Sequence, residues 1–306
     1  MKTRSFEFPS ATGVCKIAGS AFFPEGEYDA VLTIHHGMAE HQKRYLPLIR
    51  FLCDYQVAVY IYDMASHGDS KTDTGLTGWF GEKDGYLRLV QDFRTAAELA
   101  RKENPGRKQF VMGHSMGSFI CRLYLSMYPE DHPDGAVIMG SGGPNPAGKA
   151  GLAVSGLIAG IRGKKHKSAL INQMAFGAYG KRFEGRTAFD WLTRDQRIVD
   201  EYIADPMCGY LFTVQGMNDL IHANVESNAP GWYEKVPKDL PILLISGAED
   251  PVGDYGKGVQ AVEEKLRETG HDRVALKIYP DCRHEVLNEK NRDEVMNDLL
   301  AWIRQA

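Results

Sequence analysis

Short apolar segments and longer amphipathic segments alternate along most of the chain. Seven runs are typical of strands, because they are rich in Val, Ile, Leu and Tyr and several are apolar at nearly every position. They cover residues 14–23, 30–35, 57–63, 109–113, 135–140, 241–247 and 274–279. Five helical stretches lie at residues 45–55, 83–103, 118–128, 257–269 and 292–304. This alternation predicts an α/β fold with a mostly parallel, twisted sheet flanked by helices.

The alternation stops between the fifth and sixth predicted strands. Residues 142–238 open with a Gly-Gly-Pro-Asn-Pro sequence, contain a basic stretch at 162–167, and continue with helical-looking segments rich in aromatic residues. Strand-like residues resume only near Pro241. We therefore expect one domain whose core is residues 1–141 and 239–306, with residues 142–238 inserted between two strands as a helical cap, or lid.

Composition and charge narrow the class of protein. The 306 residues carry a net charge of −4, which argues against a nucleic-acid-binding protein with a broad basic surface. The N-terminus has no apolar run typical of a secretory signal, and no stretch of about 18 apolar residues is present. The five cysteines are scattered and form no CxxC pair. These features predict a cytoplasmic protein without a transmembrane segment, a disulfide framework or a zinc site.

The strongest chemical signal is the run Gly113-His114-Ser115-Met116-Gly117. It lies between a predicted strand and a predicted helix, which is where Gly-x-Ser-x-Gly forms the sharp turn that exposes a nucleophilic serine. Glycines are needed on both sides because the turn is strained and crowded. The helix that follows directs backbone N–H groups toward the site and favours negative charge there. Ser115 is therefore the predicted nucleophile.

A serine hydroxyl needs a base, and the base needs an acid that orients it. In this type of sheet the acid and then the base follow the serine, at the carboxyl ends of later strands. His284 lies just after the seventh predicted strand and Asp250 lies three residues after the sixth. We expect Asp250 to be the acid in preference to Glu249 or Asp254, with Asp219 as a weaker candidate.

An oxyanion hole requires two backbone N–H donors. One is expected at Met116, directly after the nucleophile, and the other at Met38, in the loop after the second predicted strand. Neighbouring residues and two aromatic residues of the insertion are expected to contact the substrate. The expected substrate-binding residues are His36, Gly37, His114, Phe176 and Trp191. Chemistry of this kind requires neither a metal ion nor an organic cofactor.

These motifs together resemble those of the α/β-hydrolase superfamily, in particular the group of monoacylglycerol lipases and lysophospholipases, also classed with S33 serine aminopeptidases. The matching segments are residues 36–41 with 44–45, 63–70, 113–117, 247–252 and 283–289, and, within the insertion, residues 189–195 and 205–209. One departure is Ala39, where lipases of the group often have glycine. Alanine makes this loop slightly stiffer. This departure weakens the inference about the substrate more than the inference about the mechanism.

The resemblance implies an α/β-hydrolase fold with Ser115, Asp250 and His284 as the catalytic triad and Met38 and Met116 as oxyanion donors. It implies a serine esterase that works through an acyl-enzyme on a monoglyceride or lysophospholipid. The apolar segment 151–161 and the basic stretch beside it would then suit peripheral contact with a lipid surface. The sequence does not indicate an oligomeric state.

Other functions stay open at this point. A short-chain or aryl carboxylesterase would use the same triad. An aminopeptidase would need an acidic pocket, for which Glu184, Asp190 or Asp205 are available. A non-enzymatic binding protein on this fold should lack a triad member. A serine at position 115 argues against dehalogenases and epoxide hydrolases, which use aspartate, whereas a cofactor-free haloperoxidase shares the triad.

Three further features belong to the neighbourhood of the predicted site. Glu40 and Arg44 are four residues apart, and they either pair behind the oxyanion loop or form an ordinary helix-surface pair. His67 follows a strand and is interpreted as part of a turn below the site. Cys282 lies two residues from His284 and is either an inert buried thiol or a reactive one.

Overall fold

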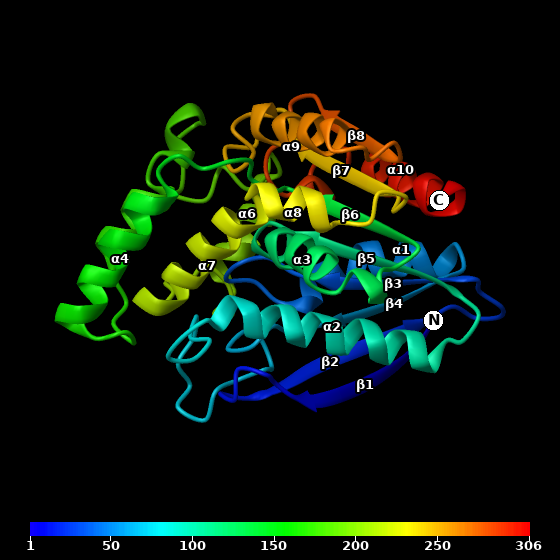
Figure 1. Cartoon of the computed structure of the whole chain (residues 1–306), viewed down its shortest axis with the longest axis horizontal. Helices are drawn as coiled ribbons and strands as arrows, with labels where there is room; N and C mark the ends of the chain where they lie inside the picture. Colours follow the sequence, from blue (N-terminus) through cyan, green and yellow to red (C-terminus); the bar gives the residue numbers. More distant parts are fainter.

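The computed structural model describes residues 1–306, which are organised around one eight-stranded sheet (Figure 1). The strands are β1 (Lys2–Pro9), β2 (Lys16–Phe23), β3 (Ala30–His35), β4 (Val57–Tyr62), β5 (Lys108–His114), β6 (Gly135–Met139), β7 (Ile242–Gly247) and β8 (Val274–Tyr279). Their order in the sheet is β1-β2-β4-β3-β5-β6-β7-β8. The six strands from β3 to β8 pair in parallel, and only β1 and β2 join antiparallel. This confirms the predicted α/β fold.

Helices cover both faces of the sheet. The core helices are α1 (Leu46–Asp54), α2 (Gly85–Glu103), α3 (Met116–Met127), α9 (Lys257–Glu268) and α10 (Arg292–Gln305). One apolar core packs α1 and α10 against the sheet, and a larger one packs α2, α3 and α9 against its other face. Successive strand residues alternate between the two: Phe110 and Met112 belong to the first core and Val111 to the second.

Five helices lie between β6 and β7, within the stretch where the sequence predicts an insertion. They are α4 (Gly148–Arg162), α5 (Ala169–Phe176), α6 (Gln196–Ala204), α7 (Val214–Ser227) and α8 (Pro230–Lys235). The helix α7 packs on α3, and α4 packs on α7 at the end of the molecule away from the sheet (Figure 1). Glycine permits this close approach, because a Cβ atom at Gly148 would lie 2.5 Å from Val225 Cγ2.

The edge strand β1 is the one strand that the sequence analysis did not predict. Its residues from Lys2 to Ser5 are exposed, and only Phe6 and Phe8 are partly buried against the core. An edge strand with so little buried surface carries little of the apolar signal on which strand prediction rests. Short 3-10 helices complete the fold: η1 (Gln42–Tyr45), η2 (Pro129–Asp131), η3 (Tyr179–Arg182) and η4 (Val286–Asn288).

The five cysteines are free thiols, and four of them are buried. Burial raises the pKa of the Cys282 thiol to about 11, and its Sγ lies 3.1 Å from Oδ1 of Asn291. Of the two interpretations weighed from the sequence, this environment favours the inert buried thiol. No helix has both the length and the apolar character that crossing a bilayer requires.

Candidate active site

Ser115 lies at the junction of β5 and α3, with φ 54° and ψ −122°. A positive φ is uncommon for a residue other than glycine and indicates a strained turn. A Cβ atom at Gly113 would lie 2.2 Å from the carbonyl oxygen of Gly117, and one at Gly117 would lie 2.3 Å from that of His35. Both flanking positions therefore require glycine. The turn holds the partly exposed Ser115 at the carboxyl end of β5, the geometry of a nucleophile elbow.

His284 and Asp250 lie together in the loops that follow β8 and β7. Nδ1 of His284 is 3.0 Å from each carboxylate oxygen of Asp250. Both side chains are almost fully buried, and Asp250 also accepts the backbone N–H of Val252 at 2.9 Å. Because the carboxylate is an acceptor, it fixes the proton of the imidazole on Nδ1 and leaves Nε2 free to accept another.

The other acidic residues weighed from the sequence lie elsewhere. Asp219, on α7, accepts the backbone N–H of Tyr86 at 3.3 Å, at the N-terminus of α2, and burial raises its pKa to about 7. Glu249 and Asp254 form no hydrogen bond with His284, whose Nδ1 bonds to Asp250. Asp250 is therefore the acid that the structure brings to His284.

The loop after β3 packs directly against Ser115. A Cβ atom at Gly37 would lie 3.1 Å from Cβ of Ser115. The backbone N–H of the next residue, Met38, has no hydrogen-bond partner within the protein. Met116 is the first residue of α3, so its N–H is one of those that a helix leaves unpaired. These two positions can therefore offer N–H groups to an oxygen atom that gains negative charge.

A cavity of about 1060 Å³ contains Ser115 and His284 in its lining. Gly37, His114, Phe176 and Trp191, four of the predicted substrate-binding residues, also line it. Their contact with a substrate remains a prediction. The lining residues supplied by α7 are Met217, Leu220, Ile221 and Asn224. The sequence analysis did not identify this wall, although the spacing i, i+3, i+4, i+7 was a signal of one helix face.

The family model described as serine aminopeptidase, S33, matches residues 26–291. The chain belongs to this family. The monoacylglycerol lipase of Mycolicibacterium smegmatis is 26% identical to it over 310 residues, which cover 98% of this chain and 97% of that protein. A thermostable carboxyl esterase from Bacillus coagulans, solved with glycerol, has a TM-score of 0.93 at 29% identity and covers 100% and 99% of the two chains. A lipase in its open form has a TM-score of 0.89 at 29% identity, and the match covers 99% of each chain. The resemblance to monoacylglycerol lipase-like α/β-hydrolases is thus confirmed.

His36 does not line the cavity, so the expectation that it contacts substrate is wrong. Its ring is fully buried, with Nδ1 2.8 Å from the carbonyl oxygen of Gly37 and Nε2 accepting the backbone N–H of Met64 at 2.9 Å. His67 acts on the same loop, since its Nε2 accepts the N–H of Ala39 at 3.1 Å. Burial lowers the pKa of both rings. Two neutral histidines therefore support the loop after β3, which the sequence predicts to form the oxyanion hole, from behind.

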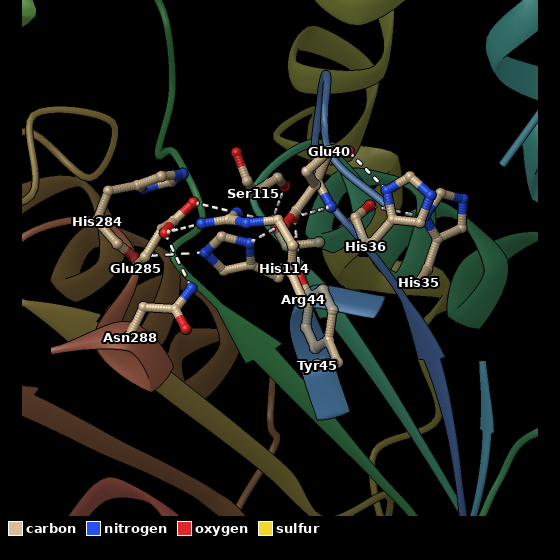
Figure 2. Close-up of polar contacts among 12 residues, drawn as sticks. His35, His36, Glu40, Arg44, Tyr45, His114, Ser115, His284, Glu285 and Asn288 are labelled. Atoms are coloured by element: carbon tan, nitrogen blue, oxygen red, sulfur yellow. Dashed lines mark hydrogen bonds and ion pairs between the residues drawn. The ribbon is translucent and has the colours of Figure 1, made fainter. Parts of the chain in front are cut away.

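Behind this loop lies a buried cluster of charged groups, shown in Figure 2. Glu40 and Arg44 pair at 2.8 Å, which confirms the pairing behind the oxyanion loop. Arg44 also donates two hydrogen bonds of 2.6 Å to Glu285, a residue that the sequence analysis did not single out. Burial opposes ionisation of both carboxyls. Arg44 nevertheless holds the pKa of Glu285 below its ordinary value, and a hydrogen bond from His114 together with Arg44 does the same for Glu40. The cluster connects the oxyanion loop to the loop that carries His284.

Glu184, Asp190 and Asp205, the acidic residues available for an aminopeptidase, do not line the cavity. Glu184 forms an ion pair with Arg283 at 2.9 Å, and Asp190 accepts the hydroxyl of Thr187 at 2.6 Å. Asp205 pairs with His41 at 2.8 Å. Each of the three is therefore committed to a contact within the protein and is not placed to bind the amino group of a substrate.

One group of side chains has the composition of a metal site. His41, Asp205 and Cys208 bring their potential ligand atoms within 4.8 Å of one another. Both ring nitrogens of His41 are already engaged, however: Nδ1 accepts the N–H of Lys43 at 3.3 Å and Nε2 bonds to Asp205. A ring whose Nδ1 accepts must carry its proton on Nε2, which leaves no lone pair for a metal ion. The group is a contact between the oxyanion loop and the insertion.

Proposed function

We propose that this protein is a serine hydrolase that cleaves carboxylic esters, with monoacylglycerols or lysophospholipids as its substrates. The observation that carries the proposal is the presence at one cavity of the strained Ser115, the hydrogen-bonded pair His284 and Asp250, and the unpaired N–H of Met38. Relatives that are named lipases and esterases, together with the placement of Glu184, Asp190 and Asp205 away from the cavity, favour an ester over a peptide.

The mechanism is acyl transfer in two steps. Nε2 of His284 accepts the proton of Ser115 as the serine oxygen attacks the ester carbonyl carbon, and the N–H groups of Met38 and Met116 stabilise the oxyanion. The bond to the leaving alcohol then breaks and His284 returns the proton to that oxygen. Water repeats the sequence on the acyl-enzyme and releases the carboxylic acid. Asp250 stays ionised and stabilises the imidazolium. These steps involve neither a metal ion nor an organic cofactor.

The substrate preference rests on the cavity and on the insertion, which we infer to be a cap over the carboxyl edge of the sheet. A volume of about 1060 Å³ is at the upper end of ordinary ligand sites, and α7 lines it with long aliphatic side chains. Such a space suits a long acyl chain. Phe176 and Trp191, both from the cap, add aromatic surface to the same cavity.

The outer surface of the cap suits contact with a lipid interface. Leu157 and Ile161 on α4 are 65% and 71% exposed, and Leu170 on α5 is 62% exposed. Exposed apolar side chains beside a basic stretch are typical of segments that lie on anionic membranes. The stretch from 162 to 167 supplies that positive charge.

The test is a series of p-nitrophenyl esters from acetate to palmitate, measured beside monooleoylglycerol, with Ser115→Ala as the blank. Highest kcat/KM at long chains with turnover of monooleoylglycerol supports the proposal. A maximum at acetate or butyrate without glyceride turnover supports a short-chain carboxylesterase, the alternative that the sequence analysis left open. Ordinary activity in Ser115→Ala, or no labelling of Ser115 by a fluorophosphonate, would contradict a serine hydrolase.

A further inference from the structure

His114 lies directly before Ser115, with its ring buried between two hydrogen-bond acceptors (Figure 2). Its Nδ1 is 3.4 Å from Oε1 of Glu40, and its Nε2 is 3.4 Å from the backbone carbonyl oxygen of His284. A neutral imidazole has one N–H and one lone pair, so it would direct that lone pair at one of these oxygens. Only the imidazolium form donates to both.

The carboxylate that faces His114 is ionised, as its other contacts indicate. Glu40 receives the N–H of Gly37 at 2.6 Å, the hydroxyl of Tyr45 at 2.9 Å and the guanidinium of Arg44 at 2.8 Å. The N–H of Gly37 and the guanidinium of Arg44 can only donate, and Arg44 carries a permanent positive charge, so these contacts favour the carboxylate form of Glu40. The oxygen next to Nδ1 of His114 therefore carries negative charge and favours the charged form of the ring.

The charges of the buried cluster balance only if His114 contributes one. Arg44 serves both Glu40 and Glu285, which leaves two carboxylates against a single guanidinium. The titratable groups that face His114 from the surrounding elements are Glu40, Arg44, Tyr45, Glu285 and His284, with Asp250 beyond His284. Burial alone would lower the pKa of His114, but the hydrogen bond to Glu40 raises it above its ordinary value.

We propose that His114 is a positioning residue that is protonated at neutral pH and whose charge opposes proton uptake by the neighbouring His284. The centroids of the two rings are 4.9 Å apart. Asp250 favours a proton on His284, and the cation at His114 works against it. The same charge makes His284 a weaker base toward Ser115 and makes its imidazolium a stronger acid toward the leaving alcohol. This role of His114 rests on the proposed function, in which His284 is the base.

The first test is a direct measurement on the wild-type protein. The imidazole ¹⁵N signals of His114, assigned by their loss in His114→Asn, should report two protonated nitrogens from pH 6 to pH 8. A neutral tautomer at pH 7 would overturn the proposal. This measurement does not depend on turnover, so it stands even if the proposed esterase activity is not found.

The second test is the pH dependence of kcat/KM in His114→Asn. Asparagine keeps a donor near Glu40 but removes the charge, so the acid limb should move to higher pH. A unit charge at 4.9 Å corresponds to a shift between about 0.6 and 2.5 pH units, for dielectric constants of about 80 and about 20. An acid limb that stays within 0.2 units of the wild type, in a folded and active variant, would overturn the proposal.

Two further variants separate charge from packing. His132→Asn removes an exposed histidine and should leave the acid limb unchanged. His114→Asn combined with Glu40→Gln removes one charge of each sign, so its acid limb should return toward the wild-type position. A purely structural role for His114 predicts the opposite, because the double variant loses more contacts than the single one.

Discussion

Replacement of Arg44 by methionine should destabilise the fold strongly, because the guanidinium forms ion pairs with two buried carboxylates. The side chains of Glu40 and Glu285 are only 4% and 5% exposed, and they lie 2.8 and 2.6 Å from Arg44. Removal of one partner of a buried pair typically costs about 3–5 kcal/mol, since it leaves a charge without a counter-ion in a medium that solvates it poorly. With two carboxylates affected, we expect a loss of about 4 kcal/mol or more at pH 8.

The loss should shrink as the pH falls. In the wild type burial opposes ionisation, but Arg44, together with a hydrogen bond from His114 to Glu40, holds the pKa of both carboxyls below the ordinary value. Their contribution to stability is thus present above the unfolded pKa of about 4.3 and is lost as the pH falls through the lower folded values. In Arg44→Met the charge that opposes burial at both carboxyls is lost, so their pKa values should rise even though His114 still faces them. The folded variant should then take up protons and recover part of its stability between pH 8 and pH 5.

Urea unfolding, followed by tryptophan fluorescence at pH 5, 6, 7 and 8, measures both the loss of stability and its dependence on pH. Arg197→Met is the matched control, because Arg197 pairs with Glu201 at a surface where both side chains are about 60% exposed, and its removal should cost less than about 0.5 kcal/mol. Adding Glu285→Leu to Arg44→Met should restore stability, since it removes one stranded carboxylate. A loss below about 1 kcal/mol at pH 8, or a loss that does not depend on pH, would refute the reasoning.

Three other changes test separate parts of the structure. Asp250→Asn should lower kcat by about 10⁴-fold on p-nitrophenyl butyrate with an unchanged melting temperature, because the wrong tautomer of His284 would be favoured; a loss below tenfold would contradict the assigned acid. Leu220→Trp should lower kcat/KM for the palmitate ester at least tenfold while acetate changes less than twofold, because it fills the α7 wall of the cavity; equal effects on both esters would argue against an acyl site there. Burial raises the pKa of Asp219 to about 7, so the folded state holds a proton that the unfolded chain loses near pH 4, and stability falls as the pH rises between these values. Asp219→Asn should therefore gain stability relative to the wild type from pH 5 to pH 8 in urea unfolding, and a constant difference would contradict the raised pKa.

The parts of the site that follow from local sequence could be predicted. The glycines around Ser115 are required by close backbone contacts, so strand, turn and helix can be recognised within a short segment. The order of acid and base after the serine follows from the topology of the parallel sheet, and the structure brings His284 and Asp250 together in that order. The turn leaves a signal in the sequence because neighbours in the chain fix it, and the acid and the base leave one because each lies just after a recognisable strand.

Features fixed by distant residues could not be predicted in the same way. Arg44 and Glu285 are 241 positions apart, and nothing in either segment indicates that they meet. The sequence predicts that His36 contacts substrate, yet its ring does not line the cavity and accepts the backbone N–H of Met64 instead. Both outcomes depend on which side of a loop faces the core, and this is decided by packing between elements rather than by the spacing of residues.

Ala39 shows how the oxyanion loop holds a conformation that its sequence does not favour. Its φ of 51° lies in the left-handed region, which costs a residue with a Cβ atom about 1–2 kcal/mol. Three hydrogen bonds compensate: its N–H donates to His67 at 3.1 Å, and its carbonyl oxygen accepts from the Tyr202 hydroxyl and the Gly209 N–H, both at 3.0 Å. Two of these three come from the insertion. Any displacement of Tyr202 and Gly209 from the core would remove them and leave the strained residue held by His67 alone, so the position of the insertion and the geometry of the oxyanion loop are energetically coupled.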